Sequence, residues 1–185
     1  MKKQSNILII GAGQLGSRYL QGLIPLIDDV KIYVIDPLNS SLENCRKLIF
    51  SCIKENHKDI IYLNSIDEIN IKNPELVIIS STSQGRAKLI SEVKEKIYPK
   101  YWIIEKVLEQ SIYELENIKN YLSDIKGKAW INNPRRIMHW HIKLKECINS
   151  IKNSHGPLEF KYKGINWGLG CNSIHLINLV SWFSG

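Results

Sequence analysis

The chain has 185 residues, of which 44% are hydrophobic and 23% are charged, and its formal net charge is +7. This is ordinary globular composition, and the length supports one large core and a fraction of a second domain. No apolar run reaches the roughly 20 residues of a membrane-spanning helix, and the first predicted strand follows directly on Met1–Gln4, so neither a membrane protein nor a secretory signal peptide is expected.

Basic residues and cysteines limit the function further. The lysines are scattered among isoleucines and asparagines instead of forming one tract, which favours solvated faces over a nucleic-acid-binding surface. The cysteines are far apart and lack CxxC spacing, which indicates reduced thiols and no disulfide framework or zinc site. We therefore expect a cytoplasmic protein with no nucleic-acid partner, no membrane partner and no metal. The four cysteines are Cys45, Cys52, Cys147 and Cys171.

The first apolar segment runs into a glycine-rich turn, ILIIGAGQLG, at Ile7–Gly16. Gly11 permits a tight turn, Gly13 lets a pyrophosphate approach the backbone, and Gly16 allows close packing of helix and strand. The amides of Gln14 and Leu15, at the start of the following helix, would face the phosphates. The pattern strand, turn and helix is the context that a dinucleotide-binding fingerprint requires.

The second apolar segment, Ile32–Ile35, ends in Asp36, where a carboxylate can accept hydrogen bonds from both ribose hydroxyls of an adenosine. A 2′-phosphate would meet this negative charge, and the next residue is Pro37 instead of an arginine, so NAD is favoured over NADP. Two alternatives remain for the turn alone. It could be a glycine turn that binds nothing, or the first turn of a methyltransferase that binds S-adenosylmethionine.

Short apolar segments continue to alternate with helical patterns. Ser40 or Ser41 is a candidate cap for the second helix, and Ser111 with Glu114 fits a capping box for the fourth. This order predicts an α/β protein with a Rossmann-type, doubly wound parallel sheet that binds ligands at the carboxyl ends of its strands. Strands are predicted near 6–10, 31–35, 60–63, 76–80, 101–105 and 128–132, and helices near 14–26, 40–55, 84–97 and 111–123.

Polar residues follow two of these strands. Ser81 and Thr82, after the fourth strand, form a small polar loop that either lies against a cofactor ring or caps the next helix. Glu105 and Lys106 end the fifth strand. A lysine at this edge can bind a substrate hydroxyl and stabilise a developing alkoxide, although a surface ion pair is the alternative. We assign Ser81, Thr82 and Glu105 to the cofactor and Lys106 to catalysis.

The pattern changes near Gly127, so we expect a nucleotide-binding domain over 1–125 and the beginning of an α+β domain over 126–185. Helices are predicted over 137–152 and 172–184, and a strand over 158–165. A single strand cannot make a sheet. The strand therefore joins the first sheet, or the chain is the front part of a longer protein, which is the alternative we favour.

His175 is the third candidate for chemistry, because a histidine near its ordinary pKa suits proton transfer to or from a hydroxyl or carbonyl. Cys171 lies one helical turn earlier on the same face. The alternative is a satisfied core histidine. His139 and His141 point to nearly opposite sides of their helix, and no carboxylate or cysteine completes a metal site with them.

These residues together resemble the Gfo/Idh/MocA oxidoreductases, the glucose–fructose oxidoreductase and inositol dehydrogenase group. Glu105-Lys106-Val107 is similar to the Glu-Lys-Pro motif of that family, and residues 170–178 are similar to its D-x-x-x-H-x-x-D helix, with His175 at the catalytic histidine. The resemblance implies hydride transfer between a nicotinamide and a sugar or cyclitol carbon, with histidine as acid/base and lysine orienting the substrate. It also implies a second domain with an open sheet that often forms dimers or tetramers.

Two positions depart from the family pattern, since Cys171 and Asn178 stand where aspartates are usual. Asn172 is a candidate to replace part of the lost hydrogen bonding, and Arg135 or Arg136 is a candidate to bind an anionic substrate group. With Trp167 upstream, this version resembles a branch from surface-polysaccharide gene clusters, which implies a free or nucleotide-linked sugar as substrate. These residues form the predicted substrate side of the site.

The sequence supports two candidate functions. The first is an NAD-dependent oxidoreductase acting on a sugar, cyclitol or nucleotide sugar. The second is a catalytically inactive NAD-binding sensor or assembly protein, which the missing aspartates motivate. A short-chain sugar epimerase or dehydratase would need a Tyr-x-x-x-Lys pair, and no tyrosine of this chain has a lysine four residues later.

Overall fold

The computed structural model describes residues 4–26, 30–52, 59–151, 157–166 and 168–185. The chain divides into two compact units, Met1–Ile131 and Asn132–Gly185, called unit 1 and unit 2 below. The division falls six residues after the domain boundary expected from the sequence, so almost all of the sixth strand belongs to unit 1. Each unit is described by itself.

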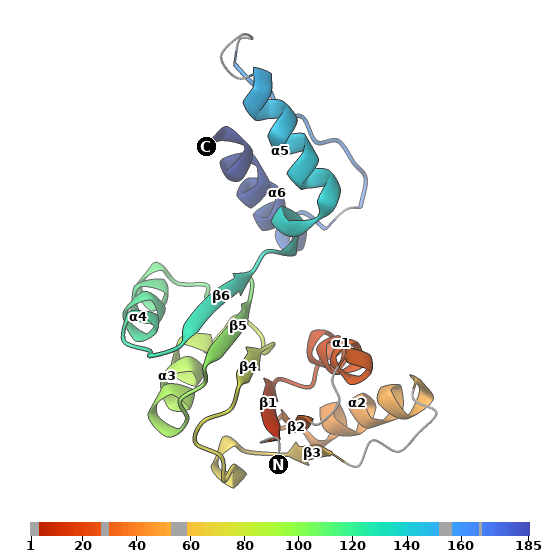
Figure 1. Ribbon diagram of the computed structural model, residues 1–185, viewed down its shortest axis with the longest axis vertical. Coiled ribbons are helices and arrows are strands. Elements are labelled where there is room, and N and C mark those ends of the chain that lie inside the picture. Colours follow the sequence, from red (N-terminus) through yellow and green to blue (C-terminus); the bar gives the residue numbers. More distant parts are fainter. Residues whose placement is uncertain (1–3, 27–29, 53–58, 152–156, 167) are drawn as a thin grey trace. The chain divides into compact units, whose positions relative to one another are not determined.

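Unit 1 contains a six-stranded sheet in the order β3-β2-β1-β4-β5-β6 (Figure 1). The first five strands along the chain pair in parallel, and β1 lies between β2 and β4. The strand order therefore reverses at β1, and ligands of open α/β sheets bind at such a switch point. The predicted Rossmann-type α/β fold is confirmed. The strands are β1 (Ser5–Ile10), β2 (Val30–Ile35), β3 (Ile60–Leu63), β4 (Leu76–Ile79), β5 (Tyr101–Glu105) and β6 (Lys128–Asn132).

Helices connect these strands close to the predicted positions. Ser111 caps α4, since its hydroxyl accepts a hydrogen bond from the Glu114 amide at 3.4 Å. The predicted cap of α2 is wrong, because this helix begins at Asn39 and places Ser40 and Ser41 inside its first turn. The helices are α1 (Gln14–Leu23), α2 (Asn39–Cys52), α3 (Arg86–Lys96) and α4 (Ile112–Ser123), with short 3-10 turns η1 (Ile24–Leu26) and η2 (Ile66–Glu68).

The core of unit 1 has two layers, one on each face of the sheet. Successive side chains of a strand point to opposite faces, so Leu8 and Ile10 pack in the cluster that contains Ile90 of α3 and Ile118 of α4. Ile9, between them in sequence, packs in the cluster that contains residues of α1 and α2. Burial on both faces explains why the strands are continuous apolar runs, and it holds the β1–α1 turn at a fixed place.

Unit 2 consists of η3 (Pro134–Ile137), α5 (His139–Ile151) and α6 (Leu169–Ser184) in the part that the structure describes. Its buried apolar cluster is small and consists of Ile148, Leu179 and Phe183. The strand predicted over 158–165 is wrong, since the described residues there form no strand. Of its apolar side chains, Phe160 stacks on Phe183 with ring centroids 5.9 Å apart, whereas Leu158, Tyr162 and Ile165 are exposed.

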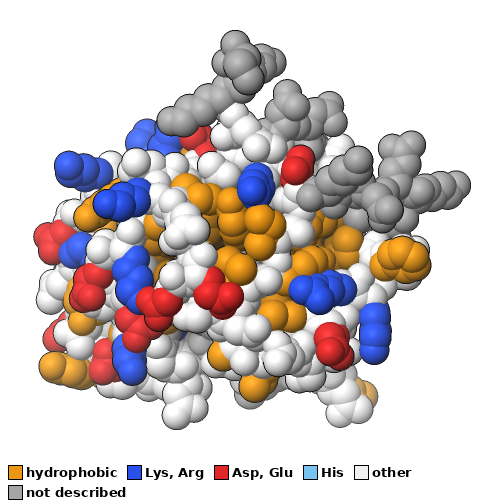
Figure 2. Space-filling view, turned by 90° about the horizontal axis from the view of Figure 1, so that it is seen from below, with side chains coloured by type: hydrophobic (Ala, Val, Ile, Leu, Met, Phe, Trp, Pro, Cys, Tyr) orange, Lys and Arg blue, Asp and Glu red, His pale blue; other side chains and the backbone are white. Residues whose placement is uncertain are grey.

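The surface carries charges of both signs. Figure 2 shows basic and acidic side chains interspersed on one face, with apolar side chains exposed between them. Among the described residues, none of the helices combines the length and the apolar character needed to cross a bilayer.

Candidate functional site

The glycine turn after β1 is built so that two of its three glycines cannot carry a side chain. Gly11 has a φ of +103°, and a Cβ added there would lie 2.7 Å from the Ser81 amide nitrogen. A Cβ added at Gly16 would lie 1.8 Å from the carbonyl oxygen of Gly11. Both contacts are with backbone, so a side chain at either position would force the turn, the helix and the β4 end apart.

Gly13 is different, because a Cβ added there meets nothing within 4 Å. It is exposed, and as N-cap of α1 it has an ordinary φ of −67°. Gln14 and Leu15 follow as exposed residues of the first helical turn. The space in front of Gly13 is thus open to a ligand, and the first amides of α1 border it. This is the arrangement that a pyrophosphate needs at a helix N-terminus.

Asp36 is almost buried and joins the ends of β1 and β2. One carboxylate oxygen accepts a hydrogen bond from the Ala12 amide at 2.8 Å, and the other accepts from the Leu38 amide at 2.9 Å. A carboxylate offers about four acceptor sites, so acceptor capacity remains for ribose hydroxyls. The sequence assigned this residue to the ribose alone; in the structure it also fixes the glycine turn.

The end of β4 is also tied to the turn. The buried Ser80 hydroxyl donates to the carbonyl oxygen of Gly11 at 2.8 Å. Ser81, next along the chain, is half-buried, and its hydroxyl donates to the Thr82 carbonyl at 3.2 Å. Ser81 therefore lies beside the glycine turn, at the carboxyl edge of the sheet, and Thr82 follows it as an exposed residue. Contact of the two with a cofactor stays a prediction.

Arg86 is a site residue that the sequence interpretation missed. It opens α3, is 2% exposed, and its guanidinium donates to the backbone carbonyls of Ser81, Glu105 and Val107. Two of these carbonyls flank Lys106, so one side chain fixes the loop after β4 and the segment after β5 together. A signal was present, because a cation in the first turn of a helix opposes the helix dipole and needs another reason to be there.

Two buried carboxylates surround this arginine, Glu105 at 4% and Glu109 at 6% exposure. Tyr19 of α1 donates its hydroxyl to Glu105 at 2.5 Å. Burial lowers the pKa of Arg86, and the charges of Glu105 and Glu109 oppose that shift. For Glu109, burial alone would raise the pKa, but the amides of Gln110, Ala87 and Arg86 and the Arg86 charge lower it on balance. The half-buried Lys106 thus projects from a buried network of opposite charges.

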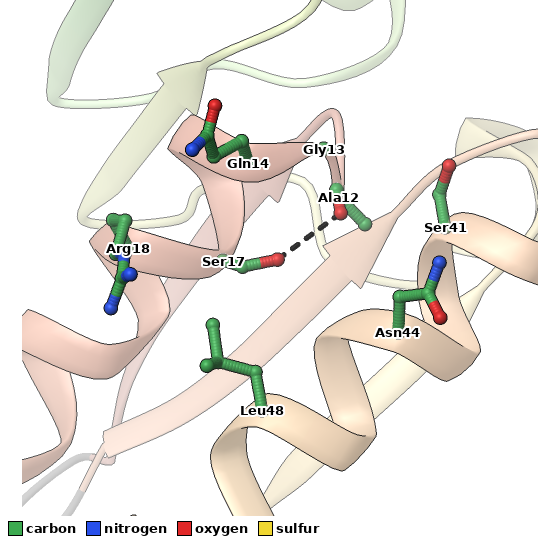
Figure 3. A pocket seen from close by; sticks show the side chains of 8 residues that line it. All are labelled: Ala12, Gly13, Gln14, Ser17, Arg18, Ser41, Asn44 and Leu48. Carbon is green, nitrogen blue, oxygen red and sulfur yellow. Dashed lines mark hydrogen bonds between the residues drawn. The ribbon is translucent and has the colours of Figure 1, made fainter.

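A pocket of about 250 Å³ lies beside the turn, between α1 and α2 (Figure 3). The Ser17 hydroxyl donates to the Ala12 carbonyl at 3.2 Å on its floor, and Ser41 and Asn44 line it from α2. These polar groups suit ribose or phosphate oxygens, and the sequence did not single them out. The pocket is lined by Ala12, Gly13, Gln14, Ser17, Arg18, Ser41, Asn44 and Leu48.

Unit 2 contains the predicted substrate side. His175 and Asn172 are half-buried on α6 and Cys171 is exposed. The Asn172 amide donates to the Gly168 carbonyl at 3.3 Å, at the start of the helix. Arg135 is half-buried in η3, and Trp167 lies outside the described residues. Lys106 belongs to unit 1 and His175 to unit 2.

The sequence predicts no metal site. Within the described ranges, no group of three or more His, Cys, Asp or Glu side chains is arranged to hold a metal ion.

The parallel sheet, its switch point and the glycine turn define a Rossmann-type α/β protein. No family model matches the chain, and no curated protein matches it in sequence. Solved structures do match. They include scyllo-inositol dehydrogenase from Lactobacillus casei, with a TM-score of 0.69, 17% identity, and coverage of 99% of this chain and 56% of that one.

Two further solved structures show the range of these matches. A putative NADPH-dependent oxidoreductase from Desulfitobacterium hafniense matches with a TM-score of 0.72 and 15% identity over 99% of this chain and 56% of that one. The transcriptional regulator Gal80p from Kluyveromyces lactis matches with a TM-score of 0.62 and 13% identity over 80% and 37%. The chain spans just over half the length of the first inositol dehydrogenases that it matches, and the Rossmann-type fold that the family resemblance implies for the nucleotide-binding domain is confirmed.

Proposed function

We propose that the chain carries the cofactor-binding part, and the histidine-bearing beginning of the substrate part, of an NAD-dependent oxidoreductase of the Gfo/Idh/MocA type. Its substrate would be the hydroxyl or carbonyl of a sugar, cyclitol or nucleotide sugar. The observation that carries the proposal is the open position at Gly13, bordered by two glycines that exclude side chains and by the Asp36 carboxylate. The fold shared with inositol dehydrogenases supports it.

Each residue has a defined task in this proposal. The turn and the amides of Gln14 and Leu15 hold the pyrophosphate, Asp36 accepts from the ribose, and Ser81, Thr82 and Glu105 border the cofactor. The bound nicotinamide supplies or accepts the hydride. Lys106 orients the substrate hydroxyl, and His175 moves a proton to or from its oxygen. The substrate-side residues are Cys171, Asn172, Arg135 and Trp167.

NAD is the preferred cofactor in this proposal because Asp36 is fixed in place. Its two bonds to the Ala12 and Leu38 amides prevent the carboxylate from turning away from an incoming 2′-phosphate. A phosphate there would meet a nearly buried negative charge. The full protein would work in the cytoplasm, as a homodimer or tetramer if a complete second domain follows.

Calorimetric titration of the chain with NAD and with NADP tests this proposal. We expect NAD to bind at least tenfold more tightly, and Asp36→Arg to shift the preference toward NADP. His175→Ala should lower turnover of a sugar substrate far more than it lowers NAD affinity. Lys119→Gln, on the exposed surface of α4, is a control for general charge effects. Absence of binding to both dinucleotides would contradict the proposal, and equal losses of turnover and affinity in His175→Ala would remove the catalytic role.

A second candidate is an NAD-binding sensor or assembly protein without turnover. Cys171 and Asn178 replace both aspartates of the family helix, and the fold is shared with the regulator Gal80p. Incubation of the NAD-loaded protein with neutral sugars, sugar acids and nucleotide sugars separates the two candidates. NADH absorbance that stays at baseline across this panel, with NAD bound, favours the sensor.

A further inference from the structure

The positive charge of the chain is concentrated in its last third. Residues 132–185 contain seven of the 25 Lys and Arg but only two of the 18 Asp and Glu, which gives +5 of the net +7. Both acids are already paired, Glu146 with Lys143 at 2.8 Å and Glu159 with Lys161 at 3.0 Å. Within the described residues, neither Arg135 nor Arg136 forms an ion pair with a carboxylate. Unit 2 therefore has cationic groups without an internal counter-ion.

Arg136 is the best positioned of these cations. From η3 it reaches α6, where its Nε donates to the side-chain oxygen of Asn178 at 2.7 Å and one Nη donates to the Asn178 backbone oxygen at 3.2 Å. The guanidinium is half-buried and held by these two bonds. A guanidinium has five N–H groups, and these two bonds use two of them. An arginine fixed in this way can bind a carboxylate or phosphate through two parallel bonds.

The partner of Arg136 lies on the functional face of α6. Asn178 follows His175 by three residues and Cys171 by seven, and this spacing places all three on one stripe of the helix. The core residues Leu179 and Phe183 occupy the neighbouring stripe. The guanidinium is thus bonded to a residue that follows the predicted acid/base by about one helical turn and shares its face of α6.

We propose that Arg136, held by Asn178, is an anion-binding subsite, and that the substrate is an anionic sugar that carries a carboxylate or a phosphate. The proposal rests on the proposed function, because it assigns the substrate class of that site. The amide of Asn178 is decisive. Its side-chain oxygen accepts a hydrogen bond from the arginine without neutralising it, whereas an aspartate at the same position would form an internal ion pair and compete with the anion of the substrate.

The test compares matched sugars with and without an anionic group. Hexoses, the corresponding uronates and the corresponding 6-phosphates are titrated calorimetrically into the full chain, with and without saturating NAD. We expect at least one anionic sugar to bind tenfold or more tightly than its neutral parent, with the uronates and phosphates separating the two anions. R136Q should reduce this preference to less than twofold, N178D should reduce it similarly, and R136K should retain part of it because the charge remains.

Lys143→Gln is the matched control, since it removes a cation of unit 2 that already pairs with Glu146. It should leave the preference intact. Equal affinity for neutral and anionic sugars, binding of none of them, or an equal loss in K143Q and R136Q would each overturn the subsite. Circular dichroism of N178D, an isosteric change, guards against misfolding as the cause. Failure of the proposed function appears separately, as absence of NAD binding in the cofactor titration.

Discussion

Two glycines of the β1–α1 turn have different tasks. Gly16 is needed for the stability of the turn, whereas Gly13 keeps the space open for a ligand. A Cβ at Gly16 meets a backbone oxygen at 1.8 Å, whereas a Cβ at Gly13 meets nothing. We therefore expect Gly16→Ala to destabilise unit 1 by several kcal/mol, about the size of other severe backbone clashes. Gly13→Ala should cost about 1 kcal/mol or less, yet weaken NAD binding tenfold or more. Urea unfolding and NAD titration of both variants measure the two effects.

One result for the Gly13→Ala variant would contradict this prediction. A Gly13→Ala protein that binds NAD as tightly as the wild type would show that no phosphate approaches this position. A Gly22→Ala variant is the control, because Gly22 lies in α1 and has open space at its Cβ position.

Asp36 gives a second prediction at the residue scale. Asp36→Asn keeps the shape but offers one acceptor oxygen for two backbone amides, those of Ala12 and Leu38. A buried amide without its acceptor costs about 1–3 kcal/mol, so the free energy of unfolding should fall by about that amount, and the preference for NAD over NADP should shrink. Chemical denaturation and paired titrations measure these changes. Unchanged stability would mean that the carboxylate does not hold the turn.

Individual residues differed in how far the sequence could predict them. Gly11, Gly16 and Asp36 were predictable because their tasks depend on local geometry and short spacing. The position of Arg86 in the first turn of its helix was a signal, but its carbonyl partners were not predictable, because they come from two segments, the loop after β4 and the end of β5, whose contact exists only in the folded sheet. Asn178 was similar, since its value as a partner depends on Arg136, 42 residues away in sequence.

At the scale of elements, Arg86 connects α3 to the ends of β4 and β5. Arg86→Gln would remove hydrogen bonds to the carbonyls of Ser81, Glu105 and Val107, and it would remove the cation beside the buried carboxylates of Glu105 and Glu109. Breaking one side of a buried charge network costs about 3–5 kcal/mol, so we expect a melting temperature lower by about 10 °C or more. Thermal unfolding followed by circular dichroism checks this, with Lys88→Gln on the same helix as the exposed control. A decrease in melting temperature no larger than that of Lys88→Gln would contradict this structural role of Arg86.

Helix α5 should respond to pH through His141, which is 2% exposed and lies 6.1 Å from the ring of Phe183. Burial lowers the pKa of His141, the Arg135 charge lowers it further, and a bond to the Arg135 backbone opposes both. The unfolded chain then binds the proton more readily, so α5 has full stability above about pH 6.5 and loses it as the pH falls through the lower folded value.

Amide hydrogen exchange of α5 between pH 7.5 and 5 measures that loss, after correction for intrinsic exchange rates. His141→Gln removes the titrating group and should flatten the profile, while His139→Gln, exposed on the same helix, should not. Identical pH profiles for the wild type and His141→Gln would show that this histidine does not carry the effect.

Element prediction succeeded where periodicity and pairing agreed. The first five strands of unit 1 are apolar runs that pair in parallel, and the predicted sixth strand lies beside β5 at the edge of the same sheet. The segment 158–165 has the same alternation of apolar and polar residues, but a strand also needs a partner edge. Within it Phe160 stacks on Phe183 of α6, while Leu158, Tyr162 and Ile165 are exposed. The periodicity of a segment therefore does not by itself establish a strand, because the pairing must come from elsewhere in the fold.

At the scale of the whole molecule, the two units have very different cores. Both large apolar clusters, with the sheet, the glycine turn and Asp36, lie in unit 1. The described part of unit 2 buries Ile148, Leu179 and Phe183, while Ile165 is 91% and Ile177 64% exposed. A segment of 54 residues with so small a core has little surplus over its conformational entropy.

This contrast predicts that residues 1–131 fold alone and bind NAD within about twofold of the affinity of the full chain, whereas residues 132–185 alone show little stable helix. Circular dichroism of both fragments and NAD titration of the first measure the outcome. A fragment 1–131 that folds but loses NAD binding would mean that unit 2 contributes residues to the cofactor site. A fragment 132–185 that melts cooperatively would show instead that its small core suffices, because the free energy of burying three large side chains would then exceed the entropy of ordering two helices.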